Sequence, residues 1–381
     1  MIIIKLISHP NFSMMLLGMF LNLFCSNNYG TMQKFEKEIR KIENKYIPDK
    51  SLAVFKATIS EDQGKWTLNG ETDNKDAYRE LASFSDSLLS SESFTNNIFI
   101  LPDTALGDSN FAIINVSVTP IRESPSHASQ MVDQAILGNE IQLLRYQNGW
   151  YLSKTHYSYV GWINKTALFV CDSINKNKWI KNANYIVSDI QATIYESPSH
   201  LSQPVTDVVL NNILIGNNQN GDYTSIILPD GRNGFIHNKS LEAIYAKENE
   251  QRKSKSILTN AYKMLGVPYL WGGNSTKGND CSGFTQTIFK ANGIQIPRDA
   301  RQQALEGVEI HPDKKWSNIF PGDLLFFGTN ERVTHVGISI GKKDFIHQGG
   351  MVSINSLDEN SSNFSPQRLE TFLFVRRLDH L

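Results

Sequence analysis

Residues 268–293 read PYLWGGNSTKGNDCSGFTQTIFKANG and contain the most informative pattern in the chain. From residue 281 to residue 291 the apolar side chains have helical spacing, and the Asn292-Gly293 pair that follows is typical of a helix C-terminus. Asp280 stands just before this segment, where a short polar side chain caps a helix. Cys281 is therefore expected in the first turn of a helix.

This predicted position suits Cys281 to nucleophilic chemistry. Free backbone N–H groups and the positive end of the helix dipole favour a thiolate, and the same N–H groups can bind a developing oxyanion. The alternative is a structural role, because cysteine is among the most buried residue types. A cysteine behind a helix cap and a Gly-Gly loop is not a typical core residue, so we interpret Cys281 as a nucleophile.

A thiolate nucleophile needs a base, and the base needs a group that orients it. Residues 323–327 (DLLFF) predict a buried strand, and residues 333–340 (VTHVGISI) alternate as a strand does. This alternation places His335 on the less crowded face, beside Gly337. His335 is the candidate base.

A second histidine follows on the next predicted strand. A three-residue turn would pair Ile340 with Asp344 and bring His347 opposite Gly337, one diagonal step from His335. A two-residue turn would shift the strand pairing by one residue and place the two histidines on opposite faces of the sheet. The pattern predicts that His347 orients the catalytic imidazole.

The middle of the chain contains an internal repeat. ESPSH at residues 123–127 recurs at residues 196–200, and Gly-Trp-Ile at 161–163 matches Gly-Phe-Ile at 234–236, both with an offset of 73. Each copy of about 60–70 residues is rich in short β runs, which predicts a small β barrel. We interpret ESPSH as a turn signature, which needs no catalytic role for its histidine.

The first 30 residues have the layout of a secretory signal. Lys5 precedes a largely apolar stretch at residues 14–25, and small or polar residues follow to Gly30. The apolar stretch is too short to span a membrane, and a buried hydrophobic helix is the alternative. Cys25 invites a lipid-anchor interpretation, which the bulky Phe24 before it disfavours.

Between the signal and the repeat, the pattern predicts a small α+β module with no visible catalytic constellation. Its expected elements are a helix over residues 35–46, strands at 52–60 and 65–72, a helix over 76–89 and a strand at 97–101. A charged stretch at residues 242–256 is expected to link the repeat to a helix over 257–265.

Composition excludes several classes of protein. The 381 residues carry 37 Lys and Arg against 38 Asp and Glu, a net charge of −1, which argues against a nucleic-acid-binding surface. No uncharged apolar run long enough to span a membrane follows residue 30. Three cysteines do not make a disulfide framework, and no metal-ligand spacing is present.

Six segments resemble, in order, those of the NlpC family of papain-like cysteine peptidases, which cut bacterial cell-wall peptides. The resemblance covers about residues 255–381. The segments are PYLWGG (268–273), DCSGF (280–284), IPRDARQQ (296–303), PGDLLFF (321–327), THVGI (334–338) and the FIH that ends at His347.

The resemblance implies a role for each matching residue. Cys281 would be the nucleophile, His335 the base and His347 the third member, with no cofactor and no metal. Six residues would contact the substrate. They are Tyr159, Tyr269, Trp271, Asp280, Ser282 and Ala300, of which Tyr269 would join the Cys281 amide in the oxyanion region and Ala300 stands where some relatives have serine.

The two repeat copies resemble bacterial SH3-like domains, and the whole layout looks like the γ-D-glutamyl-L-diamino acid endopeptidases. In that group the first SH3-like domain covers the cleft and reads a free N-terminal L-Ala, a role that Tyr159 matches. Asp280 would offer the amine a carboxylate. Where a second acid is expected the chain has Gln130, with Asp133 nearby. The aromatic residues Trp150, Tyr151, Tyr159 and Trp162 also suggest an exposed ligand surface.

We therefore expect a multidomain α+β protein that cuts muropeptides containing diaminopimelate and acts as an exported monomer in the periplasm or cell envelope. No nucleic acid and no membrane span are expected. The expected parts are a signal (1–30), the α+β module (31–108), two SH3-like β barrels (109–170 and 171–245) and a papain-like α+β catalytic domain (246–381).

Three alternatives stay open from the sequence. The chain could be a wall-binding protein without activity, a zinc protein that uses Cys281 and the two histidines, or an amidase or acyltransferase with the same thiol chemistry. The choice between diaminopimelate and lysine is also open, as is that between intact wall and released peptides.

Overall fold

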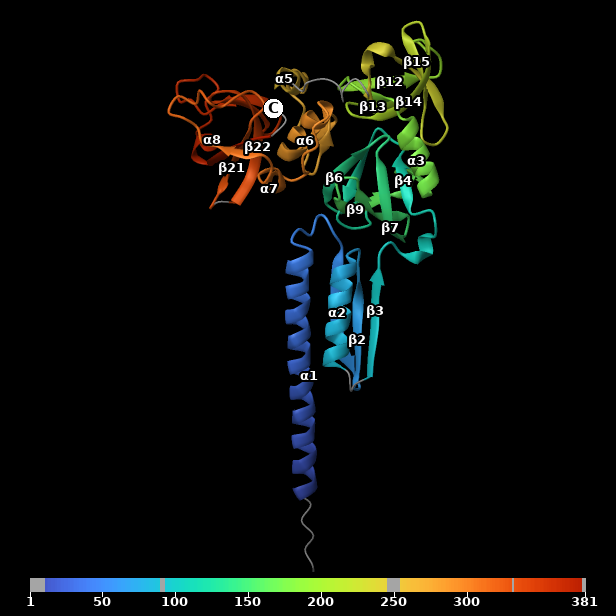
Figure 1. Cartoon of the computed structure of the whole chain (residues 1–381), viewed down its shortest axis with the longest axis vertical. Coiled ribbons are helices and arrows are strands. Elements are labelled where there is room, and N and C mark those ends of the chain that lie inside the picture. The colour runs from blue at the N-terminus through green and yellow to red at the C-terminus, as the bar shows by residue number, and fades with distance from the viewer. Residues whose placement is uncertain (1–10, 90–92, 245–253, 331, 379–381) are drawn as a thin grey trace, which may run out of the picture. The chain divides into compact units, whose positions relative to one another are not determined.

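A computed structural model of the chain describes residues 11–89, 93–244, 254–330 and 332–378. The chain forms two compact units, Met1–Thr104 and Ala105–Leu381 (Figure 1). Both units mix helices with β-sheets, so the predicted α+β class is confirmed. Among the helices described, none has the length and apolarity needed to cross a membrane.

The first unit is a three-stranded sheet with two helices. β2 pairs with β1 in antiparallel and with β3 in parallel orientation, and α2 connects β2 to β3. Its core joins Phe35 of α1, Trp66 of β2 and Leu81 of α2. The predicted helix over 35–46 is the C-terminal part of a longer α1. The elements are α1 (Asn11–Tyr46), β1 (Phe55–Asp62), β2 (Lys65–Thr72), α2 (Lys75–Leu88) and β3 (Ser93–Ile100).

The internal repeat forms two seven-stranded sheets with the same topology. The first has strand order β10-β4-β7-β8-β9-β5-β6, and the second, written from its other end, has order β17-β11-β14-β15-β16-β12-β13. The strands of the first copy are β4 (Phe111–Ile114), β5 (Val118–Arg122), β6 (Met131–Ile136), β7 (Glu140–Gln147), β8 (Trp150–Thr155), β9 (Val160–Asn164) and β10 (Leu168–Cys171). Those of the second are β11 (Tyr185–Val187), β12 (Gln191–Tyr195), β13 (Pro204–Val209), β14 (Ile213–Asn220), β15 (Tyr223–Ile227), β16 (Asn233–His237) and β17 (Leu241–Ala243).

The repeated sequence motifs have the same structural role in both copies. The backbone N–H of Ser124 donates to the Ser129 hydroxyl at 2.9 Å, and that of Ser197 donates to the Ser202 hydroxyl at 3.0 Å, so ESPSH is a turn as predicted. A Cβ at Gly161 would lie 2.4 Å from a methyl group of Ile121. The equivalent glycine of the second copy has the same constraint, which explains why both copies keep it.

The aromatic residues of the first copy do not form the exposed surface that their density suggested. Trp150, Tyr159 and Trp162 are only 5%, 7% and 4% exposed. Alternation along a short strand does not show which of its faces the neighbouring parts of the chain cover. The prediction of an exposed aromatic surface is therefore wrong for these three residues.

A helix between the two copies was not predicted. α3 (Ser173–Asn182) is capped by Asp172, and its Trp179 indole N–H donates to the Gly138 carbonyl at 2.9 Å. A Cβ at Gly138 would lie 2.2 Å from the Ile213 carbonyl oxygen. The second copy therefore packs closely against the first through α3 and this turn.

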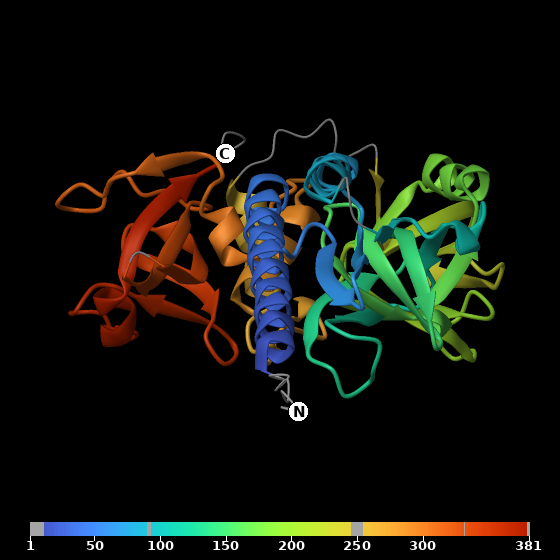
Figure 2. The ribbon, with the colours of Figure 1, turned by 90° about the horizontal axis from the view of Figure 1, so that it is seen from below.

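The C-terminal part is a six-stranded sheet with strand order β20-β25-β21-β22-β23-β24. The helices α5, α6 and α7 pack against one face of the sheet (Figure 1 and Figure 2). Arg368 of α8 instead lies over the ring of Phe327, which belongs to the core of the other face. Most of the linker predicted at 242–256 lies outside the described residues. The helices are α5 (Ser254–Lys263), α6 (Cys281–Ala291), α7 (Ala300–Gln303) and α8 (Pro366–Glu370), and the strands are β20 (Val308–Ile310), β21 (Leu324–Thr329), β22 (Arg332–Gly341), β23 (Asp344–Gln348), β24 (Val352–Ser356) and β25 (Phe372–Arg377). A two-stranded ribbon of β18 (Asn274–Ser275) and β19 (Gly278–Asn279) precedes α6.

Candidate active site

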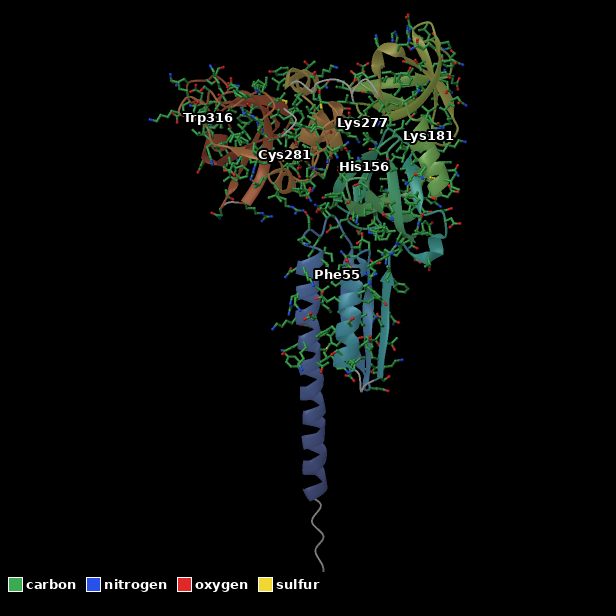
Figure 3. The ribbon with its side chains drawn as sticks, in the orientation of Figure 1. Phe55, His156, Lys181, Lys277, Cys281 and Trp316 are labelled. Atoms are coloured by element: carbon green, nitrogen blue, oxygen red, sulfur yellow. The ribbon has the colours of Figure 1, made fainter. Side chains whose placement is uncertain are left out.

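Cys281 is the first residue of α6, where the sequence placed it (Figure 3). The Asp280 side chain caps the helix by accepting a hydrogen bond from the Gly283 backbone N–H at 2.7 Å. A Cβ at Gly283 would lie 2.0 Å from the Gly273 carbonyl oxygen, so the glycine lets the helix start approach the preceding loop. The thiol is held in a nearly buried position with 9% exposure.

The two histidines lie on neighbouring strands in the predicted diagonal relation. Gly337 of β22 pairs with His347 of β23, as expected. The expected pairing of Ile340 with Asp344 is wrong, because Asp344 pairs with Gly341 and the turn has two residues. A β-bulge leaves Ile340 without a pairing partner, so the two histidines still lie on the same face of the sheet.

The histidine rings are joined in a hydrogen-bonded chain that ends at an unpredicted residue, Asn355 of β24. His335 Nε2 lies 2.7 Å from His347 Nδ1, and His347 Nε2 lies 2.8 Å from Asn355 Oδ1. The Asn355 amide nitrogen donates to the Asn363 carbonyl at 3.1 Å, which fixes the amide with its oxygen toward the ring.

This chain defines the tautomer of each ring. The Asn355 oxygen can only accept, so His347 carries its proton on Nε2 and presents a bare Nδ1. His335 must then donate from Nε2, which leaves its Nδ1 unprotonated and basic. An imidazole with one basic nitrogen is what a general base requires.

Burial disfavours the charged form of both reacting groups. It raises the pKa of the Cys281 thiol to about 11, with Asp280 adding to the effect and the Val336 and Ser282 backbone N–H groups opposing it. Burial also holds the pKa of His335 well below its usual value, with smaller contributions from Arg368 and His347. For this thiol, desolvation outweighs the effect of the helix N-terminus on the pKa.

A cleft of about 310 Å³ opens beside the thiol. Its wall includes residues of the first repeat copy, such as Gln130, as well as residues of the C-terminal part. Cys281 and all six predicted substrate contacts line it, namely Tyr159, Tyr269, Trp271, Asp280, Ser282 and Ala300. The structure thus brings together six predicted contacts that lie up to 141 positions apart in the chain, from Tyr159 to Ala300.

Arg298, which we did not single out from the sequence, connects the first repeat copy to the helix cap. Its side chain is 2% exposed, and its Nε lies 2.6 Å from a carboxylate oxygen of Asp133. Nη1 and Nη2 bind the two Asp280 oxygens at 3.0 and 2.7 Å. The remaining N–H groups donate to the Ser282 hydroxyl and the Gly273 carbonyl, so all five donors have acceptors.

This network explains which carboxylates are available in the cleft. Asp133 is fully buried and does not line the cleft, so it does not replace the acid expected near Gln130. Asp299 does line the cleft and was also missed. The Tyr159 hydroxyl donates to Asp299 at 3.4 Å, and Arg301 lies 2.9 Å from the other Asp299 oxygen.

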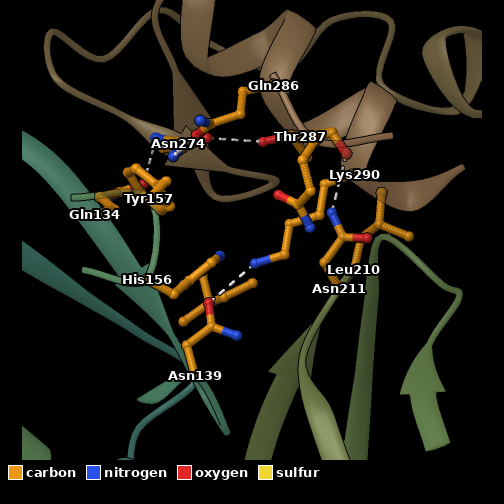
Figure 4. A pocket seen from close by; sticks show the side chains of 12 residues that line it. Gln134, Asn139, His156, Tyr157, Leu210, Asn211, Asn274, Gln286, Thr287 and Lys290 are labelled. Carbon is orange, nitrogen blue, oxygen red and sulfur yellow. Dashed lines mark hydrogen bonds between the residues drawn. The ribbon is translucent and has the colours of Figure 1, made fainter. Parts of the chain in front are cut away.

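A second, much smaller cavity lies where the two repeat copies meet α6 (Figure 4). It has about 20 Å³ of free space, enough for one water molecule. Lys290 Nζ donates to Asn139 Oδ1 at 3.0 Å, and the Asn211 amide donates to the Thr287 carbonyl at 2.9 Å. Burial lowers the pKa of Lys290 to about 8. These polar contacts tie α6 to both copies.

Within the described ranges, no group of three or more His, Cys, Asp or Glu side chains is arranged to hold a metal ion. The three residues of the zinc alternative are arranged instead as a thiol and two hydrogen-bonded imidazoles.

The comparison with known proteins identifies two families along the chain. Residues 266–366 match the NlpC/P60 family, and residues 121–168 match the bacterial dipeptidyl-peptidase Sh3 domain. The first range contains the cysteine, both histidines and Asn355. The second contains Tyr159 and Asp133.

Individual relatives agree with these matches. Dipeptidyl-peptidase 6 of Lysinibacillus sphaericus is 28% identical over 65% of this chain and 92% of its own length. A γ-D-glutamyl-L-lysine dipeptidyl-peptidase of Bacillus cereus is 30% identical over 58% of this chain and 68% of its own length. A crystal structure of an NlpC/P60 family protein from Bacillus cereus has a TM-score of 0.61 at 24% identity, over 70% of this chain and 99% of that chain.

These similarities and the thiol–imidazole site define a cysteine peptidase. The chain belongs to the NlpC/P60 family.

Proposed function

We propose that this chain hydrolyses the amide between γ-D-glutamate and the following diamino acid, diaminopimelate, in peptidoglycan peptides with a free N-terminal L-Ala. The observation that carries the proposal is the composite cleft, in which the first repeat copy and the catalytic part both contact the space beside Cys281. A wall built by a second domain limits how much peptide can precede the scissile bond, which fits a short N-terminal dipeptide.

The proposed mechanism starts from the neutral pair. As the thiol sulfur attacks the γ-carbonyl carbon, His335 Nδ1 takes the thiol proton, and His347 and Asn355 hold the imidazolium in place. The resulting oxyanion can accept hydrogen bonds from the Cys281 backbone N–H and the Tyr269 hydroxyl. Burial, Cys281 and Asp280 raise the pKa of Tyr269 to about 12, so its hydroxyl stays protonated and able to donate.

His335 then gives its proton to the leaving amine of the diamino acid, and an acyl-enzyme with the L-Ala-γ-D-glutamyl group remains. Water attacks this thioester with His335 again acting as base, which releases the dipeptide and restores the thiol. Both half-reactions use the same basic nitrogen.

The free amine of the L-Ala would be recognised at the end of the cleft that Tyr159 lines. An ammonium group removed from water needs anionic acceptors. Asp299 lines the cleft and has the Tyr159 hydroxyl beside it. Asp280 can add its charge, although Arg298 already binds both of its oxygens.

The proposal extends to the organisation and location of the enzyme. We propose that the two seven-stranded sheets are SH3-like barrels with the limits 109–170 and 171–245, between the module at 31–108 and the catalytic domain at 246–381. Peptidoglycan lies outside the cytoplasm, so residues 1–30 would act as an export signal, and a monomer would work in the periplasm or cell envelope.

The test is mass spectrometry of L-Ala-γ-D-Glu-diaminopimelate after incubation with the protein. We expect release of L-Ala-γ-D-Glu, and none from the Cys281→Ala variant. The same tripeptide with an acetylated N-terminus tests the amine, and we expect it to be cut at least tenfold more slowly, roughly the loss expected for one charge-assisted contact. Equal cleavage of both peptides would refute the proposed amine recognition.

A further inference from the structure

One arginine of the catalytic cleft forms no ion pair with a described carboxylate. Asp280 is paired with Arg298, and Asp299 is paired with Arg301. Two arginines line the cleft, Arg301 and Arg332, and Arg332 is exposed. No described carboxylate lies within ion-pair distance of it, so its guanidinium is open to an anionic group of a ligand in the cleft.

Arg332 occupies a fixed position relative to the base. It is the first residue of β22, the strand that carries His335 three positions later. Val333 and Thr334 line the cleft too, because a β-bulge at Thr334 interrupts the alternation of the strand. The segment of β22 that leads to the catalytic imidazole is therefore part of the cleft wall, and Arg332 belongs to it.

We infer that Arg332 binds a carboxylate of the substrate next to the scissile amide and thereby sets the specificity of the enzyme. The inference rests on the proposed function. A γ-linked D-glutamate keeps its α-carboxylate free, and diaminopimelate carries a second carboxylate that lysine lacks. A guanidinium in a partly enclosed cleft binds such a group through two parallel N–H donors, a geometry that a lysine ammonium does not reproduce.

Four tripeptides separate the two possible carboxylates. All begin with L-Ala, the second residue is γ-D-glutamate or its α-amide, and the third is diaminopimelate or L-lysine. We would measure kcat/KM on each for the wild type, Arg332→Gln and Arg332→Lys. Arg232→Gln is the matched control, because Arg232 is an arginine of the second repeat copy that pairs with Asp230 and does not line the cleft.

For the wild type, we expect removal of the recognised carboxylate to lower kcat/KM roughly tenfold or more. Arg332→Gln should lower kcat/KM by a similar factor on the peptide that has this carboxylate, and should no longer distinguish the two members of that pair. Arg332→Lys should recover only part of the discrimination, and Arg232→Gln should behave as the wild type. Discrimination between glutamate and its amide assigns the α-carboxylate, and discrimination between diaminopimelate and lysine assigns the distal one.

The inference is overturned if the wild type cuts all four peptides equally, or if Arg332→Gln keeps the discrimination of the wild type. Both results would leave the proposed function standing, because cleavage itself persists. If the wild type cuts none of the four peptides, both the proposed function and this inference are refuted. Melting temperatures equal to that of the wild type would show that the variants fold.

Discussion

Arg298 and Asp133 form an ion pair at 2.6 Å in which the two side chains are 2% and 0% exposed. Asp133 belongs to β6 of the first repeat copy, and Arg298 precedes α7 of the catalytic part. Since the same guanidinium binds Asp280, one cation joins the neighbouring domain to the cap of the helix that begins with Cys281. The Tyr157 hydroxyl also donates to Asp133, which completes the network.

Arg298→Met should be strongly destabilising. The change leaves two carboxylates with little or no exposure and without their cation, and breaking a buried pair in this way costs about 3–5 kcal/mol. Urea unfolding measures the loss. Arg232→Met, which breaks an exposed pair, should cost no more than about 1 kcal/mol. A comparable small loss for Arg298→Met would show that the network does not hold the domains together.

The resting thiol of Cys281 should be protonated at neutral pH. Because burial raises its pKa to about 11, the thiolate fraction and the rate of alkylation by iodoacetamide should rise about tenfold per pH unit between pH 7 and pH 10. The measurement needs a protein in which Cys25 and Cys171 are replaced by serine. A rate that is already constant above pH 6 would indicate a preformed thiolate–imidazolium pair and contradict the neutral resting state.

Asn355→Ala should impair catalysis with little effect on substrate binding. Without the amide oxygen, His347 is free to take the other tautomer, and His335 then loses the acceptor that keeps its Nδ1 basic. We expect kcat to fall by about 10- to 100-fold, within the contribution of a general base, with KM nearly unchanged. Asn355→Asp keeps an acceptor and should retain more activity than the alanine variant. Equal losses in both variants would indicate a merely structural role.

Lys290 should make stability depend on pH in the alkaline range. Burial lowers its pKa in the folded protein from 10.5 to about 8, so the unfolded chain binds more protons between these values. The contribution of Lys290 to the free energy of unfolding should therefore rise as pH rises from 8 to 10.5. Below pH 8 the protein lacks this added stability. Because Lys290 is only partly buried, we expect a gain on the order of 1 kcal/mol.

The comparison of wild type with Lys290→Met isolates this contribution, because other groups titrate in the same range in both proteins. The difference in unfolding free energy should shift in favour of the wild type as pH rises. The exposed Lys181 of α3 supplies the control variant, Lys181→Met. A pH-independent difference for Lys290→Met would contradict the claim that burial lowers the pKa of Lys290.

Local patterns predicted the catalytic elements well. The cap at Asp280 and the first turn at Cys281 follow from neighbouring residues, so no distant contact was needed to place them. The pairing of Gly337 with His347 was also predicted, but the turn length on which it was based is wrong. The bulge at Ile340 compensates, and it depends on the strand's pairing partner rather than on its own sequence.

Features that depend on distant packing could not be predicted. The pairing of Arg298 with Asp133 joins residues 165 positions apart and has no local signal. The raised pKa of the Cys281 thiol follows from burial, which the first helical turn alone does not reveal. The aromatic residues of the first copy were misplaced for a related reason, since alternation along a short strand does not say which face is covered.

The most direct test of the central claim is the mass of the products from L-Ala-γ-D-Glu-diaminopimelate. The account predicts the dipeptide L-Ala-γ-D-Glu and free diaminopimelate from the wild type, and an unchanged tripeptide from Cys281→Ala. Cleavage between L-Ala and D-Glu, or equal cleavage by both proteins, would contradict the claim that Cys281 attacks the γ-glutamyl amide.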